Sequence, residues 1–148
     1  MRACIQRVKN AKVSVSNAVV GQIDGGMLVL LGVEHGDTHE DADYIIKKLA
    51  SLRIFEDDAG KMNLSLSDVH GEILLISQFT LLGDARHGRR PSFSDAAAPD
   101  DANALYEYVA DALARDFTVA RGVFGADMDV ELINQGPVTL LLDSRKLF

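Results

Sequence analysis

The distribution of hydrophobic and polar residues predicts strands over the first third of the chain. RACIQRV is strand-like, and Val13 and Val15 alternate with polar residues in the segment that follows. MLVLLGV is a continuous apolar run, which is typical of a strand buried on both faces. Asn17 and the pair Gly25–Gly26 are natural turn positions between these runs. We therefore expect this region to form a small antiparallel β unit.

The pattern changes to the helical period at two places further along the chain. Thr38 with Asp41 three residues later resembles a capping box at the start of the first predicted helix. A second helix is predicted to begin near Pro99, with Asp100 and Asp101 at the positive end of its dipole. The apolar stripes are Ala42, Ile45, Ile46, Leu49 and Leu52 in the first helix and Leu105, Tyr108, Val109, Ala112 and Leu113 in the second.

The remaining segments complete an α+β pattern. FEDDAGKMN is a turn-rich connection, EILLISQFTLL is a buried strand candidate, and strand patterns return in FTVARGVFGADMDVELI and VTLLLDS. Strands interrupted by two helices predict one domain over residues 1–148. Its sheet is expected to be mixed and strongly curved, like a barrel, with both helices packed on one face.

Composition narrows the class of protein. The 148 residues are 47% hydrophobic and 25% charged, which is typical of a globular domain and not of a disordered or fibrous chain. No apolar run approaches the roughly 20 residues of a membrane span, and the N-terminus lacks the apolar region of a secretory signal. A single cysteine, Cys4, cannot form an internal disulfide. We expect a cytoplasmic protein without a membrane partner.

The charge of the chain is compatible with nucleic-acid binding only at a local basic site. A formal net charge of −7 argues against a protein that coats nucleic acid through a general positive field. RHGRR, from Arg86 to Arg90, is nevertheless a dense basic run. It is either a solvated surface loop or a phosphate site, because guanidinium groups bind phosphate in a bidentate manner.

Common hydrolase and metal motifs do not occur in the sequence. There is no nucleophile elbow, Walker loop, H-E-x-x-H or G-x-G-x-x-G. His35 and His39 are four residues apart among acids and could hold a metal, but a solvated helix start explains them better. We therefore expect no metal and no cofactor.

Two short segments break the strand pattern that surrounds them. In SQFTLL, Ser77, Gln78 and Thr80 are polar residues in an otherwise buried strand, and they either bond to backbone at a strand end or line a cleft. In NQGPVT, Gly136 and Pro137 stand between apolar runs, although both residues weaken a strand. That pair is either an ordinary turn or a backbone shape with a chemical purpose.

Taken together, these segments resemble the D-aminoacyl-tRNA deacylase (D-tyrosyl-tRNA deacylase) family, editing enzymes that remove D-amino acids from tRNA. SQFTL, an arginine-rich loop ending in RPSF, and NQGPVT occur in the order and spacing of the family. IQRV, RIFEDDAGKMN and FGADMDVEL are also similar, so the resemblance covers essentially the whole chain. Gln135 departs from it, because many members carry an acidic residue there.

The resemblance implies a homodimer with a cis peptide bond between Gly136 and Pro137. This pair would project from one subunit into the pocket of the other, beside the expected catalytic residues, which are Ser77, Gln78, Phe79 and Thr80. A rigid ridge of backbone carbonyls would exclude L side chains and admit D-amino acids. Glycine has no side chain to exclude, so glycyl-tRNA is expected to be accepted at least in part.

The implied reaction is hydrolysis of the ester between the amino acid and the terminal ribose of tRNA. Thr80 is a candidate nucleophile, but no base adjoins it in the sequence, although a distant histidine could fold near it. The favoured alternative is that the pocket positions the ester while the 2′-OH of the tRNA assists attack by water. Backbone donors near Phe79 and Thr80 would then contribute to the acceleration.

The same resemblance suggests which residues hold the rest of the substrate. Arg86, Arg89 and Arg90 are expected to contact tRNA phosphates, and Arg7 is a further candidate. No contact with DNA is expected. The residues expected to line the pocket are Phe124, Met128, Val138 and Thr139, with a core role as the alternative for Phe124 and Met128.

Two other functions remain as alternatives. One is a non-catalytic RNA-binding or assembly protein that uses the same cleft. The other is an editing domain that acts in trans on L-amino acids, since the fold resembles the N-terminal editing domain of archaeal threonyl-tRNA synthetases. The Gly136–Pro137 pair argues against the second, because its geometry should exclude L side chains.

Overall fold

The computed structural model describes residues 1–148 and has an α+β architecture, as predicted. Neither α-helix has the length and hydrophobicity that a membrane span requires. The strands are β1 (Arg2–Val15), β2 (Ala18–Ile23), β3 (Gly26–Gly32), β4 (Phe55–Glu56), β5 (Met62–Leu64), β6 (Glu72–Ser77), β7 (Val119–Arg121) and β8 (Asp129–Asp143), and the helices are α1 (His39–Ser51), a 3-10 helix η1 (Phe79–Leu82) and α2 (Pro99–Leu113).

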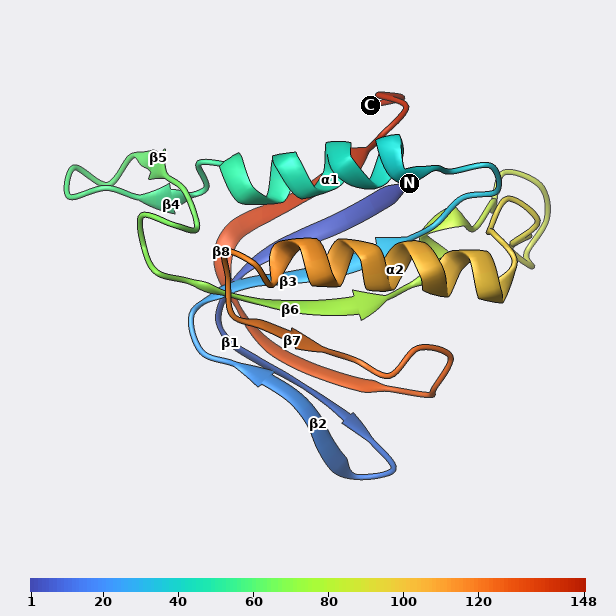
Figure 1. Ribbon diagram of the computed structural model, residues 1–148, viewed down its shortest axis with the longest axis horizontal. Helices are drawn as coiled ribbons and strands as arrows, with labels where there is room; N and C mark the ends of the chain where they lie inside the picture. Colours follow the sequence, from blue (N-terminus) through green and yellow to red (C-terminus); the bar gives the residue numbers. More distant parts are fainter.

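The main sheet is mixed and strongly curved, which confirms the predicted sheet (Figure 1). Its order is β2-β1-β3-β6-β7, and β8 pairs with β1 as well. β1 is antiparallel to β2, β3 and β8, whereas β6 runs parallel to both β3 and β7. At Gly21 of β2 an added Cβ would lie 2.7 Å from the carbonyl oxygen of Arg121 in β7. The two ends of the sheet therefore approach each other, and the sheet is nearly closed.

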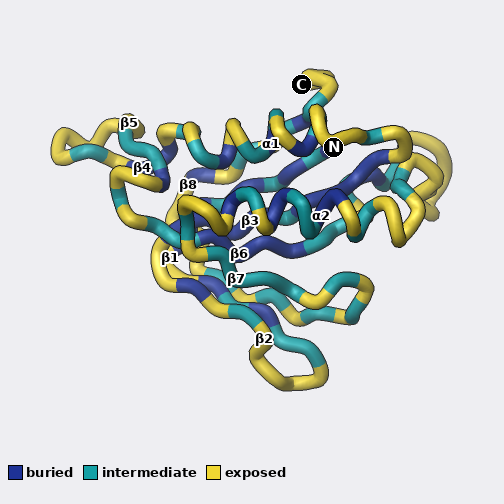
Figure 2. The backbone as a smooth tube through the Cα atoms, viewed as in Figure 1, coloured by how far each residue is buried: buried dark blue, intermediate teal, exposed yellow.

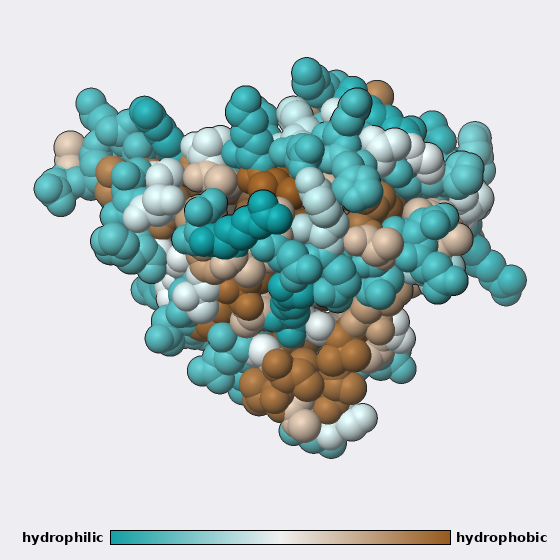
Figure 3. All heavy atoms as spheres, in the orientation of Figure 1, coloured by the Kyte–Doolittle hydropathy of each residue, from teal (hydrophilic) through white to brown (hydrophobic).

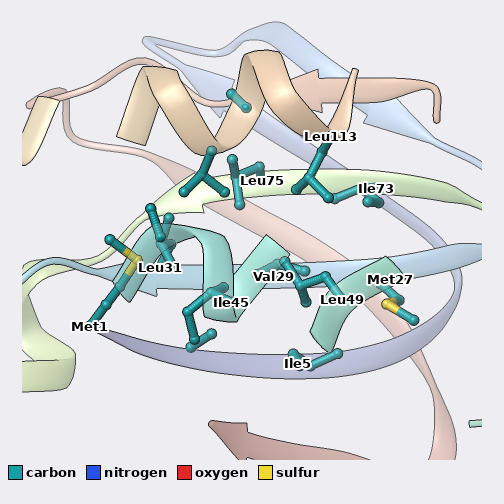
Figure 4. Packing of buried hydrophobic residues seen from close by; sticks show 14 of the residues in the cluster. Met1, Ile5, Met27, Val29, Leu31, Ile45, Leu49, Ile73, Leu75 and Leu113 are labelled. Atoms are coloured by element: carbon teal, nitrogen blue, oxygen red, sulfur yellow. The ribbon is translucent and has the colours of Figure 1, made fainter. Parts of the chain in front are cut away.

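Buried residues are concentrated in the central strands of this sheet (Figure 2), and a hydrophobic cluster lies on each of its sides. On one side, α1 and α2 pack over it, and Leu49 and Leu113 share a cluster with Val29 (Figure 4). On the inner side, Leu28 and Leu74 belong to a second cluster enclosed by the curved strands. β3 is thus buried on both faces, as its continuous apolar run predicted, and both helices lie on one face of the sheet.

The helix boundaries follow the capping signals in the sequence. The Thr38 N–H donates to Asp41 Oδ2 at 2.9 Å, and Thr38 Oγ1 accepts from the Glu40 N–H at 3.3 Å. The second helix begins at Pro99, whose missing N–H costs nothing in a first turn. Both predicted helix starts are confirmed.

Two predicted segments differ from the observed structure. The strand expected over EILLISQFTLL ends at Ser77, after which the chain turns into η1. The cause is tertiary, because the Gln78 N–H donates the last ladder bond, to the Leu31 carbonyl at 2.7 Å, and the partner strand β3 itself ends at Gly32. The turn-rich connection contains a small hairpin of β4 and β5, in which Asp57 Oδ1 accepts the Ala59 and Lys61 N–H groups.

NQGPVT is a bulge inside β8 and not a turn between two strands. Gln6 of β1 pairs with Thr139, and Val8 pairs with Asn134, so the four residues 135–138 face a single residue of β1. The Gly136–Pro137 bond in this bulge is cis. The Asn134 side-chain amide closes the base of the bulge, since it donates to the Arg7 carbonyl at 3.0 Å and to the Val138 carbonyl at 3.1 Å.

Candidate functional site

A cavity of about 530 Å³ lies at the carboxyl end of β6, between the sheet and the N-terminal half of α2. Twelve of its 17 lining residues are hydrophobic, so it suits a ligand with a large apolar or aromatic part. Its walls come from β3, the end of β6, the segment before α2, α2 itself and the β7–β8 loop. The residues are Leu31, Val33, Ile76, Ser77, Gln78, Phe79, Ala96, Ala97, Pro99, Ala102, Tyr106, Phe124, Gly125, Ala126, Asp127, Met128 and Val130.

The end of β6 supplies the polar part of this cavity. Ser77, Gln78 and Phe79 line it, and Thr80 follows on the exposed side of η1. Gln78 Nε2 donates a hydrogen bond to Thr80 Oγ1, which fixes the orientation of the hydroxyl. Phe79 and Thr80 are the first residues of η1, where backbone N–H groups have no acceptor within the helix. The four residues predicted from SQFTL therefore lie together at one rim.

A base for a hydroxyl nucleophile does not lie beside Thr80. The Thr80 hydroxyl has Gln78 Nε2 as its only hydrogen-bond partner, and in the neighbouring cavity there is no histidine or lysine and Asp127 is the only carboxylate. Tyr106 donates its hydroxyl to the Leu75 carbonyl at 2.9 Å, and burial raises the pKa of Tyr106 to about 12. At neutral pH Tyr106 therefore stays protonated, and its hydroxyl stays bonded to the Leu75 carbonyl. The residue forms part of the cavity wall and is not a base.

The β7–β8 loop forms the opposite wall. Phe124 and Met128 both line the cavity, and the Phe124 ring centroid is 6.1 Å from that of Tyr106. Gly122 makes room for Met128, because an added Cβ there would lie 2.6 Å from Met128 Sδ.

Val138 and Thr139 do not line this cavity. Val138 is buried in the cluster beneath the helices, and Thr139 is exposed beside Gln6, whose Nε2 donates to its hydroxyl at 3.4 Å. Gly136 and Pro137 are also exposed and away from the cavity of their own chain. A Cβ added to Gly136 would have a single neighbour within 4 Å, Asn134 Oδ1 at 3.8 Å.

Arg7 is placed too deep in the fold to contact a phosphate. The residue is 2% exposed, and its guanidinium donates to the carbonyls of Ile54 at 2.6 Å and Gln135 at 3.2 Å and to Glu56 at 3.3 Å. The tRNA contact expected of it is therefore corrected to a structural one. Arg7 supports the β8 bulge from below.

The arginine loop follows η1 in the chain and returns to the Phe79 rim at Phe93, whose ring contacts that of Phe79. Arg86 is engaged with Asp84 through two hydrogen bonds of 2.9 and 2.8 Å, which lower the pKa of Asp84 to about 2. Arg89 and Arg90 are exposed and have no carboxylate within ion-pair distance. These two guanidinium groups are the available cations of the loop.

Several cavity residues were not singled out from the sequence. Ala96 and Ala97 precede α2 and look like an unremarkable small-residue stretch, yet they are held beside β3 because the Ala97 N–H donates to the Val33 carbonyl at 3.0 Å. Tyr106 is adjacent to the predicted stripe of α2. Asp127 carried no distinguishing signal in the sequence.

Comparisons with known proteins agree over the full chain. The model of the family described as D-Tyr-tRNA(Tyr) deacylase matches residues 4–143. The chain is 60% identical over 149 residues to a D-aminoacyl-tRNA deacylase of Anaeromyxobacter dehalogenans and 55% identical over 150 residues to one of Thermosipho melanesiensis, with complete coverage of both proteins in each case.

Solved structures show the same fold. A structure titled c-Myc DNA Unwinding Element Binding Protein matches with a TM-score of 0.91 and 36% identity over 97% of this chain and 98% of that one. A probable eukaryotic D-amino acid tRNA deacylase matches in fold with a TM-score of 0.81 at 19% identity, over 95% and 97%. From the family match and the full-length relatives we conclude that the chain belongs to the D-Tyr-tRNA(Tyr) deacylase family and is a hydrolase of the D-aminoacyl-tRNA deacylase class.

Proposed function

We propose that this protein hydrolyses the ester bond of D-aminoacyl-tRNA and rejects L-aminoacyl-tRNA. One observation carries the proposal: a largely apolar cavity ends in a polar rim, at Gln78, Phe79 and Thr80, without a nucleophile and base in contact. An ester needs less activation than an amide, so orientation and electrostatic stabilisation suffice for a useful rate. Gln78, Phe79 and Thr80 all come from the same chain.

Water is the proposed nucleophile. It adds to the ester carbonyl carbon while the 2′-OH of the tRNA assists its deprotonation, the C–O bond to the ribose breaks, and the ribose oxygen takes a proton. The unpartnered N–H groups at the start of η1, those of Phe79 and Thr80, would stabilise the developing oxyanion. Thr80 positions the substrate, since its hydroxyl is already held by Gln78.

Chirality is proposed to be read by a second copy of the chain. In a homodimer the β8 bulge of one subunit, with Gly136 and Pro137 at its tip, would enter the cavity of the other. The bulge is exposed, and β8 carries two exposed hydrophobic side chains, Ile133 at 52% and Leu141 at 58%. Such residues on an outer strand support an interface between copies.

A backbone ridge at this position would select by exclusion. An L side chain would collide with the bulge carbonyls, a D side chain would point away from them, and glycine would meet no obstacle. We therefore expect hydrolysis of D-tyrosyl-tRNA, partial hydrolysis of glycyl-tRNA and resistance of L-tyrosyl-tRNA.

The test compares these three substrates with the wild-type protein and with Thr80→Ala. Thr80→Ala should keep at least a tenth of the wild-type kcat/KM on D-tyrosyl-tRNA, because no bond to Thr80 forms in the reaction. Complete loss of activity in a folded variant, together with a trapped Thr80 ester in the wild type, would falsify the water mechanism. Equal resistance of glycyl- and L-tyrosyl-tRNA would contradict selection by exclusion.

A further inference from the structure

Two phenylalanines are exposed at the rim of the cavity. Phe79 is 57% exposed and lines the cavity, and Phe93 is 36% exposed. Their ring centroids are 5.1 Å apart with an interplanar angle of 71°, so they contact each other edge to face. Large aromatic side chains exposed side by side next to a cavity call for a ligand that can cover them.

The pair is held in a fixed position. Phe93 follows a short hairpin whose ends are joined by two backbone hydrogen bonds, 2.8 and 2.9 Å long, between Asp84 and Ser92. Gly83 lets the ring approach the chain, because an added Cβ would lie 2.9 Å from Phe93 Cε1. The bidentate Arg86–Asp84 contact braces the same hairpin. Because the two rings are already held in place, a ligand that binds them would lose little free energy to ordering these side chains.

Positive charge lies on the same hairpin. Arg89 and Arg90 are exposed on it within four residues of Phe93, in a chain whose formal net charge is −7. Guanidinium groups next to an exposed aromatic surface are the combination that binds single-stranded nucleic acid, since the cations contact phosphates and the ring stacks on a base. A purely hydrophobic protein partner would not account for the two arginines.

We propose that Phe93, supported edge-on by Phe79, is a stacking site for a base in the unpaired 3′ end of the tRNA. It rests on the proposed function, because the cavity beside Phe79 would hold the aminoacylated terminal residue. The stacked base would be one upstream of that residue, with Arg89 and Arg90 on the phosphates between. Stacking discriminates little among bases, so this site would accept the same tail from any tRNA.

The experiment uses the full-length protein and two RNA hairpins, one with a four-nucleotide 3′ overhang ending in CCA and one blunt. Phe93→Ala and Phe93→Leu should weaken binding of the overhang hairpin by about 5- to 100-fold and leave the blunt hairpin unchanged. Phe93→Tyr and Phe93→Trp should bind the overhang within about twofold of the wild type. Leucine keeps the apolar volume and loses the π face, so it separates stacking from packing.

Three results would overturn the proposal. The first is that Phe93→Leu binds the overhang hairpin as tightly as the wild type does. The second is that Phe93→Ala weakens binding of both hairpins equally. The third is that the loss of binding in Phe93→Ala is accompanied by a change of oligomeric state, measured by sedimentation. With D-tyrosyl-tRNA, Phe93→Ala should raise KM and leave kcat unchanged. The proposed function and the stacking site can fail separately. If the wild type hydrolyses no D-aminoacyl-tRNA but overhang binding still depends on an aromatic residue at 93, the proposed function is wrong and the stacking site is supported.

Discussion

Arg7 shows how strongly the role of a single residue depends on what surrounds it. A charged residue in the first strand of an acidic protein suggests a surface contact for a nucleic acid. In the fold it joins β1 to two distant segments, through hydrogen bonds to Ile54 and Glu56 in one and to Gln135 in the other. Removing a buried charged donor leaves its acceptors without partners, and that cost exceeds the value of the bonds themselves.

We predict that Arg7→Ala lowers the free energy of unfolding by about 2–4 kcal/mol, because the buried Ile54 carbonyl loses its donor and the Gln135 carbonyl in the bulge loses a second bond. Urea denaturation measures the change. Arg7→Lys keeps the charge but has one donor nitrogen in place of three, so its free energy of unfolding should fall between those of the wild type and Arg7→Ala. If Arg7→Ala is as stable as the wild type but binds tRNA more weakly, Arg7 contacts a tRNA phosphate after all.

Among the elements, β2 and β7 show what glycine contributes to closure of the sheet. Gly21 faces the Arg121 carbonyl, Leu74 and Val13, with the carbonyl oxygen 2.7 Å from the place of a Cβ. A side chain at this position would push the two strands apart. Since Leu74 and Val13 belong to the inner cluster, their packing would be disturbed too.

Gly21→Ala should therefore destabilise the protein by about 1–3 kcal/mol, which is the usual cost of overpacking a core. A thermal melt checks this, with Gly25→Ala as the matched control, because a Cβ there meets only the Val8 carbonyl at 3.9 Å. Equal melting temperatures for the two variants would mean that β2 and β7 are free to separate.

The arginine loop is the other element with a testable division of roles. Arg86 is held by Asp84, whereas Arg89 and Arg90 are free for phosphates. Arg89→Ala and Arg90→Ala should each reduce the slope of log K against log salt for tRNA by about 0.7–0.9, and Arg86→Ala by much less. Fluorescence titrations over a salt series measure the slopes. Three equal slopes would show that Asp84 releases Arg86 on binding.

At the scale of the whole molecule, one chain leaves two surfaces unexplained. No part of its β8 bulge lines its own cavity, and hydrophobic side chains remain exposed on β8 and, as Val19 and Val20, on β2. Figure 3 shows an apolar area at the foot of the molecule, where Figure 1 places β2. A partner copy that inserts its bulge into the cavity would account for the β8 surface. Gly136 is the residue on which this arrangement can be tested.

Gly136→Ala should leave the folded monomer intact, within about 0.5 kcal/mol, because its Cβ meets only Asn134 Oδ1 at 3.8 Å. If the bulge occupies the partner's cavity, the added methyl group should lower kcat/KM for D-tyrosyl-tRNA at least tenfold. Gln135→Ala, a neighbouring change that removes atoms, should keep most of the activity. Wild-type kinetics in Gly136→Ala would place the bulge outside the site.

Part of this structure could be read from local patterns. The two helices were predictable because their apolar period and capping residues act within a few turns, and the burial of β3 followed from its continuous apolar run. The strand end at Ser77 was not predictable, since it depends on where its partner strand β3 ends, more than forty residues earlier in the chain. Likewise, Ala96 and Ala97 became cavity walls only through contacts with the segment after β3.

The sequence by itself therefore determined the α+β class, the helices, the buried central strands and the four residues at the rim of the cavity, because each depends on short-range periodicity or on adjacency in the chain. Tertiary structure alone decided that NQGPVT is a bulge in one long strand, that Arg7 is buried beneath it, and that Phe93 stands against Phe79. Those features arise from strand register and from pairings between distant residues, for which a linear pattern carries no information.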